Sequence, residues 1–392
     1  MSTYTEQLQS FLETHQDEFK QIRQDFHQHP ELSFQEVRTS GIVADYLRKY
    51  GYTVETGIAK TGVIATLKRG NSPKVIGIRA DMDALPITEE TNLSYKSQTK
   101  AVMHACGHDG HTTIALAAAR ALSEVADFDG TVRFIFQPAE EIGSGAKKMI
   151  EEGLFTQYPV DAIYGLHNWP GLEAGKLAFI NGPAMASLDF KQIVIRGKGS
   201  HGAEPHNGTD PIVVAAHLIT AIQSIVARNI DPQEMGVITI GAINGGNAAN
   251  VIPDTVEIKL TMRAYQENVR RTMLRRLEKL IDTITDSFDA TATLTDSAGF
   301  SAVVNTSNET DFARHVAINA LGDSAVDPTF LPRTASEDFS FFLEKKKGSF
   351  LFIGNGDSAT LHNPQYNFND DIIIPAARYW VELVTAYLAK EP

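Results

Sequence analysis

The sequence predicts an α/β protein in which a mixed, mostly parallel sheet is flanked by helices and interrupted by an inserted ferredoxin-like α+β domain. Strand and helix patterns alternate along the first half of the chain, which favours a parallel sheet. The run at 74–79 is apolar without alternation, as in a strand buried on both faces. From about residue 184 the order becomes βαββαβ. A chain of 392 residues also exceeds one ordinary hydrophobic core, so two domains are expected.

The first domain is expected to occupy residues 1–183 and, after the insertion, 298–392. Its first helical pattern stops before Pro30 and its second stops at Gly51, because proline and glycine interrupt helices. Short β-rich runs mark its strands. In chain order the expected elements are helices 4–28 and 36–50, strands 52–55, 63–68 and 74–79, helix 114–122, strand 131–137, helix 144–152, strand 162–166, helix 309–321, strand 350–354 and helix 372–389.

The inserted domain is expected to occupy residues 184–297. Its first strand alternates polar and apolar positions, as a strand with one buried face does. A loop of glycine and asparagine at 244–250 separates its two middle strands. The expected elements are strand 188–195, helix 211–228, strands 236–243 and 255–263, helix 267–285 and strand 290–295.

The composition argues against several classes of partner. The formal net charge of −13 disfavours nucleic acids and anionic membranes, because both reward basic surfaces. The first 17 residues are polar and acidic, so no signal peptide is expected, and no apolar run is expected to reach the length that a membrane span needs. One cysteine cannot form an internal disulfide, which fits a reducing compartment, and we expect the cytoplasm.

The stretch MHACGHDGHTT at 103–113 holds the only cysteine of the chain and three of its twelve histidines. Thiolate and imidazole are ligands for borderline and soft metal ions. The apolar helix pattern that begins at Ile114 places this cluster on a loop at the start of a helix. A metal site is therefore expected; the alternative is a buried free cysteine beside histidines with ordinary hydrogen bonds.

Further polar residues follow predicted strands at the points where each strand ends. The carboxyl ends of parallel strands meet at one edge of a sheet, where ligands bind. Of two adjacent glutamates, one could bind metal while the other moves protons. The alternatives are a solvated turn for the aspartates and a helix N-terminus for the glutamates. The residues are Asp81, Asp83, Glu140, Glu141 and His167, with His362 near the C-terminus.

Seven short motifs, in order and spread over essentially the whole chain, resemble one family. This is the aminoacylase, hippurate hydrolase and auxin-conjugate amidohydrolase family, a branch of the dinuclear metallopeptidases. The resemblance implies a zinc-exopeptidase-like catalytic domain and an inserted domain that serves as lid and dimer contact. The motifs are RADMDALP at 79–86, HACGHDGH at 104–111, QPAEE at 137–141, GLHN at 165–168, GSHGAEPH at 199–206, NVIP at 250–253 and LHNP at 361–364.

The resemblance implies a site with two divalent metal ions, Mn, Zn, Co or Ni. Asp83 is expected to orient the ligands, and the role of Asp81 is left open because the wider superfamily has a histidine there. Cys106 stands where the wider superfamily has a bridging carboxylate, and whether the thiolate bridges both ions is also left open. The implied metal ligands are Cys106, His108, Glu141, His167 and His362.

The resemblance also implies how catalysis proceeds. Glu140 is expected to take a proton from the attacking water and pass it to the leaving amine. His201 resembles a lid histidine that reaches the site of a neighbouring subunit and polarises the carbonyl oxygen, which implies a homodimer formed through the lid domain. Asn250 and Arg263 resemble groups that hold the substrate carboxylate. Their alternatives are a loop hydrogen bond and an exposed strand charge.

The expected function is a metal-dependent amidohydrolase that cleaves the amide bond of small-molecule N-acyl-L-amino acids to a carboxylate and a free amino acid. The alternatives are a dipeptidase or carboxypeptidase of the same fold, or a non-catalytic binding protein. The complete ligand set together with Glu140 speaks against the last of these. His104 and His111 are expected to support the cluster loop, and the stretch around Asp338 is expected to cap a helix.

Overall fold

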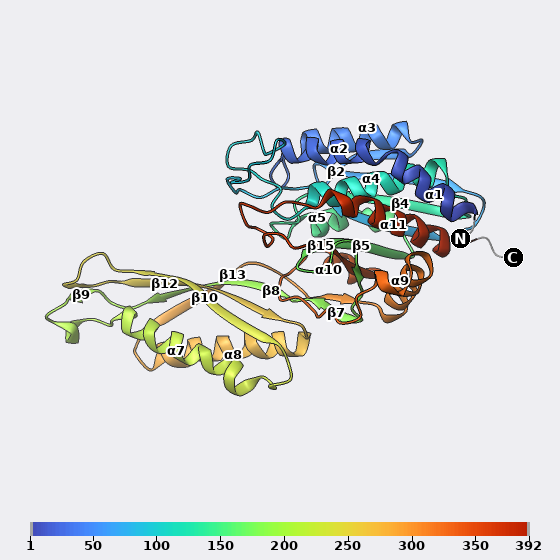
Figure 1. The fold of residues 1–392 in the computed structure, drawn as a ribbon. Coiled ribbons are helices and arrows are strands. Elements are labelled where there is room, and N and C mark those ends of the chain that lie inside the picture. The colour runs from blue at the N-terminus through green and yellow to red at the C-terminus, as the bar shows by residue number, and fades with distance from the viewer. Residues whose placement is uncertain (1–2, 390–392) are drawn as a thin grey trace. The chain divides into compact units, whose positions relative to one another are not determined.

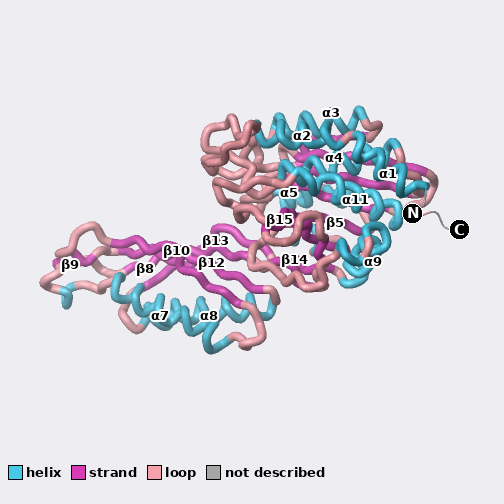
Figure 2. Tube along the Cα trace, viewed as in Figure 1, coloured by secondary structure: helices cyan, strands magenta, loops and turns pink. Residues whose placement is uncertain are grey.

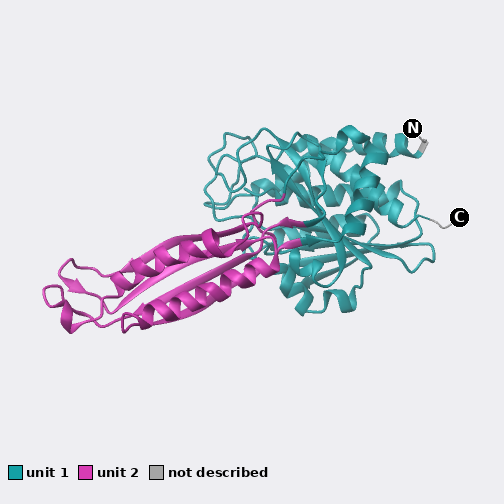
Figure 3. Cartoon of the chain, turned by 90° about the horizontal axis from the view of Figure 1, so that it is seen from below, with its two compact units in different colours: residues 1–182, 304–331, 338–392 teal, residues 183–303, 332–337 magenta. Residues whose placement is uncertain are grey.

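A computed structural model describes residues 3–389 of the chain. The chain divides into two compact units, coloured teal and magenta in Figure 3. Unit 1 comprises Met1–Gly182, Val304–Leu331 and Asp338–Pro392, and unit 2 comprises Pro183–Val303 and Pro332–Glu337. The predicted insertion at 184–297 lies within unit 2.

Unit 1 is built on a seven-stranded sheet in the order β1-β2-β4-β3-β5-β15-β6. The four inner strands β4, β3, β5 and β15 run parallel, and antiparallel strands extend the sheet on both sides. The predicted fold class, a mixed and mostly parallel sheet flanked by helices, is confirmed. The strands are β1 (Thr53–Ile58), β2 (Gly62–Arg69), β3 (Val75–Asp81), β4 (Gly130–Gln137), β5 (Ala162–Pro170), β6 (Leu177–Ala178) and β15 (Lys347–Gly356).

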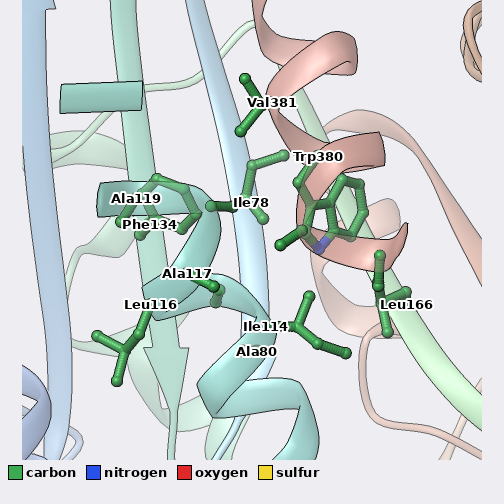
Figure 4. Packing of buried hydrophobic residues seen from close by; sticks show 14 of the residues in the cluster. Ile78, Ala80, Ile114, Leu116, Ala117, Ala119, Phe134, Leu166, Trp380 and Val381 are labelled. Atoms are coloured by element: carbon green, nitrogen blue, oxygen red, sulfur yellow. The ribbon is translucent and has the colours of Figure 1, made fainter. Parts of the chain in front are cut away.

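Two helices pack together over the middle of this sheet and enclose the main core (Figure 1). They are α4 (His108–Glu124), which is rich in alanine, and α11 (Ile373–Tyr387). Figure 4 shows Trp380 of α11 beside Ile78 of β3, and both side chains are buried. The remaining helices of unit 1 are α1 (Thr3–Thr14), α2 (Gln16–Gln28), α3 (Val37–Lys49), α5 (Gly145–Glu151), α6 (Leu154–Gln157), α9 (Ser307–Leu321) and α10 (Ser340–Leu343).

The predicted first helix, 4–28, is wrong as a single element, because it is interrupted at His15, which has non-helical dihedrals. Thr14 Oγ1 donates to the carbonyl of Ser10, and His15 Nδ1 lies 2.8 Å from the carbonyl oxygen of Phe11. The backbone N–H of His15 donates to Leu12 O at 3.2 Å, three residues earlier, so α1 ends in a tightened turn at this position.

The predicted helix at 114–122 begins earlier in the structure, at His108. Gly107 precedes it with φ +90°, a left-handed conformation that glycine adopts without strain. The first six residues of α4 are polar or glycine and are all buried, so no apolar periodicity marks them in the sequence. Half of the cysteine and histidine cluster is therefore helical and not in a loop.

Unit 2 contains a four-stranded antiparallel sheet in the order β10-β12-β8-β13, with α7 and α8 on one face (Figure 2). The chain order βαββαβ is the ferredoxin-like plan that the sequence predicts. The elements are β8 (Leu188–Arg196), α7 (Pro211–Asn229), β10 (Gly236–Gly245), β12 (Thr255–Ala264), α8 (Glu267–Asp286) and β13 (Thr291–Phe300), with a small pair formed by β9 (Ser200–His201) and β11 (Val251–Ile252). Two further short strands, β7 (Gly182–Met185) and β14 (Val303–Asn305), lie where the chain passes between the units.

One helix among the described residues, α7, is long and apolar enough to cross a membrane by length and composition, with mean hydropathy 1.5 over 18 residues. The expectation that no apolar run reaches such a length is therefore wrong. One face of α7 is buried in the core of unit 2, through Val214, Leu218, Ile222 and Ile225. This spacing of three to four residues is that of a helix that packs one face against a sheet.

A substitution at Gly110 would test how closely α4 packs against Phe368. A Cβ atom at this position would lie 2.2–2.4 Å from ring atoms of the buried Phe368. We expect Gly110→Ala to lower the free energy of unfolding by about 1–3 kcal/mol, because the core must move to admit the methyl group. Chemical denaturation measures this change.

Gly41 provides the matched control, since it lies inside α3 with no atom within 4 Å of an added Cβ. Gly41→Ala should stabilise the protein by up to about 1 kcal/mol through helix propensity. Equal effects of the two substitutions would contradict the packing described for Gly110.

Candidate metal centre

The side chains predicted from strand ends meet at the carboxyl edge of the parallel strands of unit 1. Asp81 is the last residue of β3, Glu140 and Glu141 follow β4, and His167 lies near the end of β5. His108, the first residue of α4, and Cys106, two positions before it, join them. Among the described residues, the groups whose ligand atoms lie within 4.8 Å of one another include Cys106 with His108 and His167, Cys106 with Glu141 and His362, and His108 with Glu140 and Glu141.

The distances between ligand atoms define one compact cluster. Cys106 Sγ lies 3.4 Å from His167 Nε2, and His362 Nε2 lies 3.4 Å from Glu141 Oε2. His108 Nε2 lies 3.8 Å from Glu141 Oε1. The structure therefore brings together all five residues predicted as metal ligands.

Two buried atoms indicate that these residues fit a metal ion. His108 Nε2 and Glu141 Oε1 have no hydrogen-bond partner among residues 3–389. A buried polar atom without a partner is costly, and a cation between the two would remove that cost. A set of imidazole, thiolate and carboxylate donors suits divalent ions of borderline softness.

Asp83 is buried and touches both sides of this cluster. Its Oδ1 accepts from the backbone N–H of Glu140 at 3.1 Å, and its Oδ2 accepts from that of Glu141 at 3.1 Å. His108 Nδ1 lies 2.9 Å from the carbonyl oxygen of Asp83 and 3.3 Å from its Oδ1. A proton held on Nδ1 leaves the Nε2 lone pair of His108 facing the cluster, which is the arrangement that an orienting role requires.

Asp81 is also buried, so the alternative of a solvated turn for the two aspartates is wrong. Its Oδ2 pairs with Arg79 Nη1 at 2.6 Å, and its Oδ1 lies 2.7 Å from His111 Nδ1. Both oxygens are thus engaged by neighbouring side chains. Burial raises the pKa of Asp81, but the charges of His108, Arg79 and His111 outweigh this and hold that pKa well below its usual range.

The electrostatics of the cluster favour bound cations. Burial and the nearby Glu141 and Glu140 raise the pKa of the Cys106 thiol well above its usual value. Burial lowers the pKa of His108, but Asp81 and Asp83 outweigh it and raise that pKa to about 10. Burial also raises the pKa of Glu141 to about 8. Without metal the cluster therefore retains protons, which metal ions displace when they bind.

Two non-glycine residues at the cluster have left-handed backbone conformations. Ala139, directly before Glu140, has φ +55°, and His362 has φ +63°. The carbonyl of Ala139 accepts from Gly145 N at 3.0 Å, and the N–H of His362 donates to the carbonyl of Ala105 at 2.8 Å. Such conformations require surrounding structure to hold them, and they are concentrated at functional sites.

Helix α2 anchors the segments around the cluster through a buried guanidinium. Arg23 lies 3.5 Å from Asp109 in α4 and pairs with Asp370 at 2.6 Å. His27 Nδ1 lies 2.8 Å from the same Asp109. These contacts hold the start of α4 and the segment that follows His362, so they position ligands from two distant parts of the chain.

The three predicted residues of unit 2 do not lie together. His201 and Asn250 are exposed neighbours: His201 pairs with Val251 between β9 and β11, and Gly202 N donates to the carbonyl of Asn250 at 2.8 Å. Arg263 lies at the other end of β12, a distance of roughly 25 Å for eight residues of extended chain. Within this unit, Asn250 and Arg263 therefore cannot hold one carboxylate together.

Sequence reasoning assigned no role to several buried residues beside the cluster. Asn168, Tyr366 and Arg79 are fully buried and hydrogen-bonded close to the ligands. Asn168 lies within one of the quoted motifs, but an asparagine alone does not distinguish a buried support from a turn residue. His111 supports the cluster as expected, whereas His104 is buried with no hydrogen-bond partner among the described residues.

The helix-cap interpretation of Asp338 is wrong. Helix α10 begins at Ser340 without a side-chain cap. The carboxylate of Asp338 instead accepts from Gln137 Nε2 at 2.7 Å and from Ala146 N at 3.0 Å. Its charge also lies near Arg79 Nη2, at 3.4 Å, so Asp338 belongs to the buried network behind the cluster.

Known proteins resemble the chain over almost its whole length. The hippurate hydrolase of Campylobacter jejuni is 44% identical over 373 residues, which cover 95% of this chain and 97% of that protein. The N-acetyl-L-cysteine deacetylase of Bacillus subtilis is 41% identical over 362 residues, which cover 92% and 86%. A crystal structure of the Bacillus subtilis YXEP protein, described as a dinuclear metal binding peptidase, matches with a TM-score of 0.84 and 34% identity and covers 96% of this chain and 99% of that one.

The profile of Peptidase family M20/M25/M40 matches residues 77–386, which include every member of the cluster. The resemblance drawn from the seven motifs is thereby confirmed. The chain belongs to Peptidase family M20/M25/M40.

Proposed function

We propose that the protein is a metal-dependent amidohydrolase that cleaves N-acyl-L-amino acids to a carboxylate and a free amino acid. One observation carries the proposal: Cys106, His108, Glu141, His167 and His362 converge beside a second glutamate, Glu140. The relatives named for hippurate and N-acetyl-L-cysteine act on a benzoyl and an acetyl amide, which supports this substrate class.

Two divalent ions held by the five ligands would activate a water molecule and polarise the amide carbonyl. Glu140 is the group proposed to move protons. Its Oε2 lies 4.0 Å from His108 Nε2, and its backbone N–H is fixed by Asp83. A carboxylate at this position can take a proton from the water and deliver it to the departing amine.

The exposed His201 and Asn250 are proposed to act on the site of a second copy of the chain, His201 at the carbonyl oxygen and Asn250 at the carboxylate. This assignment is supported by their proximity: His201 is in β9, and Asn250 directly precedes β11, the strand that pairs with β9. Arg263 donates to Thr334 O at 2.9 Å and to Ser336 Oγ at 2.8 Å, and it is proposed to bind a substrate carboxylate separately from Asn250.

A homodimer through unit 2 is supported by two exposed features of that unit. Helix α7 presents an uncharged face with Ile212 and Val213 each 44% exposed. Strand β10 is an edge strand of the sheet, with Val237 and Ile243 exposed. An uncharged helix face beside an open strand edge suits a second copy of the same unit.

Thr220 and Thr283 make a matched pair that tests this dimer, since both are exposed, the first on α7 and the second on α8. We expect Thr220→Glu to shift the protein from dimer to monomer and to reduce turnover, while Thr283→Glu leaves both unchanged. Sedimentation velocity and activity at the same concentration measure the two effects. A monomeric Thr220→Glu variant with full activity would contradict the proposal that His201 acts on the site of a second copy.

Glu140→Gln tests the proton-transfer role. The substitution keeps the shape of the side chain and removes its basic oxygen, so we expect turnover to fall by about 10²–10⁴-fold while metal content is unchanged. Steady-state kinetics and elemental analysis measure these quantities. Glu151→Gln, at an exposed position of α5, is the control and should behave as wild type. Near-normal turnover of Glu140→Gln would refute the assignment.

The substrate class is tested with protein that has been stripped by a chelator and reloaded separately with Mn, Zn, Co or Ni. N-acetyl, N-benzoyl and indole-acyl amino acids are compared with dipeptides and with peptides that carry a free C-terminus. We expect no hydrolysis after chelation and the highest kcat/KM on acyl amino acids after reloading. Higher kcat/KM on dipeptides or longer peptides would favour the dipeptidase or carboxypeptidase alternative. Metal binding without any hydrolysis would favour a binding protein.

A cytoplasmic location is proposed with this function. It is supported by Cys106, the only cysteine of the chain, which is free and buried in the cluster. A thiol that binds metal requires a reducing environment to remain a thiol. Recovery of the native protein in a membrane or secreted fraction would contradict this location.

A further inference from the structure

Asn168 touches two of the proposed ligands at once. It follows His167 on β5 and is fully buried. Its side-chain Nδ2 donates to the carbonyl oxygen of Cys106 at 2.7 Å. Its backbone carbonyl oxygen lies 2.6 Å from His167 Nδ1 and accepts a hydrogen bond from it. One residue thus holds the backbone next to the sulfur and the ring that faces it.

The hydrogen bonds around the amide allow one orientation only. Nδ2 faces two acceptors, the Cys106 carbonyl and His111 Nε2 at 3.1 Å. Oδ1 faces a donor, the Tyr366 hydroxyl, at 2.7 Å. Turning the amide over would place the oxygen against two acceptors and the NH₂ group against the hydroxyl. Both hydrogens and the oxygen of the amide are therefore used, and Asn168 is not itself free to bind metal.

Hydrogen bonds at both ring nitrogens fix the orientation of His111. The backbone N–H of Asn168 donates to His111 Nε2 at 3.0 Å, so this nitrogen carries a lone pair and the ring proton lies on Nδ1. The Nδ1–H group donates a hydrogen bond to Asp81 Oδ1 at 2.7 Å. Asp81 is in turn paired with Arg79. These buried contacts fix the ring of His111 with Nε2 as the hydrogen-bond acceptor.

The backbone between Cys106 and His108, at the start of α4, leaves space for this amide. A Cβ atom at Gly107 would lie 2.2 Å from Asn168 Nδ2 and 2.6 Å from the hydroxyl oxygen of Tyr366. Gly107 stands between Cys106 and His108, and any side chain there would displace the amide. The absence of a Cβ is thus a second, independent indication that the position of Asn168 matters to the cluster.

We propose that Asn168 is a positioning residue that fixes Cys106 and His167 relative to each other, with His111 as its support. The inference rests on the proposed metal centre. Cys106 Sγ and His167 Nε2 are held 3.4 Å apart with the Nε2 lone pair facing the sulfur. Glu141 and His362, which share Cys106 with this pair, receive no hydrogen bond from Asn168 or His111. Loss of the amide is therefore expected to act more strongly on the side of the centre that contains His167 than on the side of Glu141 and His362.

The experiment titrates chelated full-length protein with Co²⁺ alone by calorimetry and records the near-ultraviolet cobalt–thiolate band. Wild type is expected to show two binding steps and this band. In Asn168→Ala one step should weaken by about 10–100-fold, the usual effect of removing a group that orients a ligand. The other step should weaken less, and the thiolate band should shift or lose intensity. A general loss of stability would weaken both steps equally and would not alter the band of the loaded protein.

His111→Gln provides a second variant, to be used in the same way if Asn168→Ala does not fold. His104→Met is the matched control: this residue is equally buried, lies two positions before Cys106, and has no hydrogen bond to lose among the described residues. It should bind both ions as wild type does. Two unchanged steps and an unchanged band in Asn168→Ala and His111→Gln would overturn the inference alone. Absence of cobalt binding by the wild type would overturn the metal centre and the inference together.

Discussion

The carboxylate of Asp83 is the contact on which the arrangement of the cluster depends. It receives backbone N–H groups from both Glu140 and Glu141, a hydroxyl from Ser33 at 2.6 Å, and a ring nitrogen of His108. Two segments of chain that carry different functions, the residues after β4 and the start of α4, are therefore fixed to the same two oxygen atoms. Burial would raise the pKa of Asp83, but the hydrogen bonds and charge of His108 and the Ser33 hydroxyl bring it below its usual value, so the group remains an acceptor.

Much of the fold follows from local pattern. The non-alternating run of β3 and the change to βαββαβ are properties of short segments, and both predictions agree with the structure. The start of α4 was not predictable in this way, because its first turns are buried against polar groups and not against an apolar core. The split at His15 is a single tightened turn, in which His15 N donates to Leu12 O, and the apolar pattern of the sequence does not reveal such a turn.

The candidate ligands could be named from the sequence because cysteine, histidine and paired carboxylates at strand ends are chemically distinctive. The residues that support these ligands could not be named from the sequence. Arg79, Asn168 and Tyr366 act through contacts between residues far apart in the sequence: Tyr366 and Asn168 are separated by 198 positions, and Arg79 and Asp338 by 259. The separation of Asn250 from Arg263 also needed coordinates, since Asn250 directly precedes β11 and Arg263 lies near the far end of β12, the next strand.

Cys106 is the only thiol in 392 residues, and it lies inside the cluster with 7% of its surface exposed. A reagent that labels thiols therefore has one target in the whole molecule, and no background from other cysteines needs to be subtracted. Labelling becomes a direct gauge of how often the centre opens, in the native chain and without an engineered reporter. The same thiol that oxidants can attack therefore also reports how often the cluster becomes exposed to solvent.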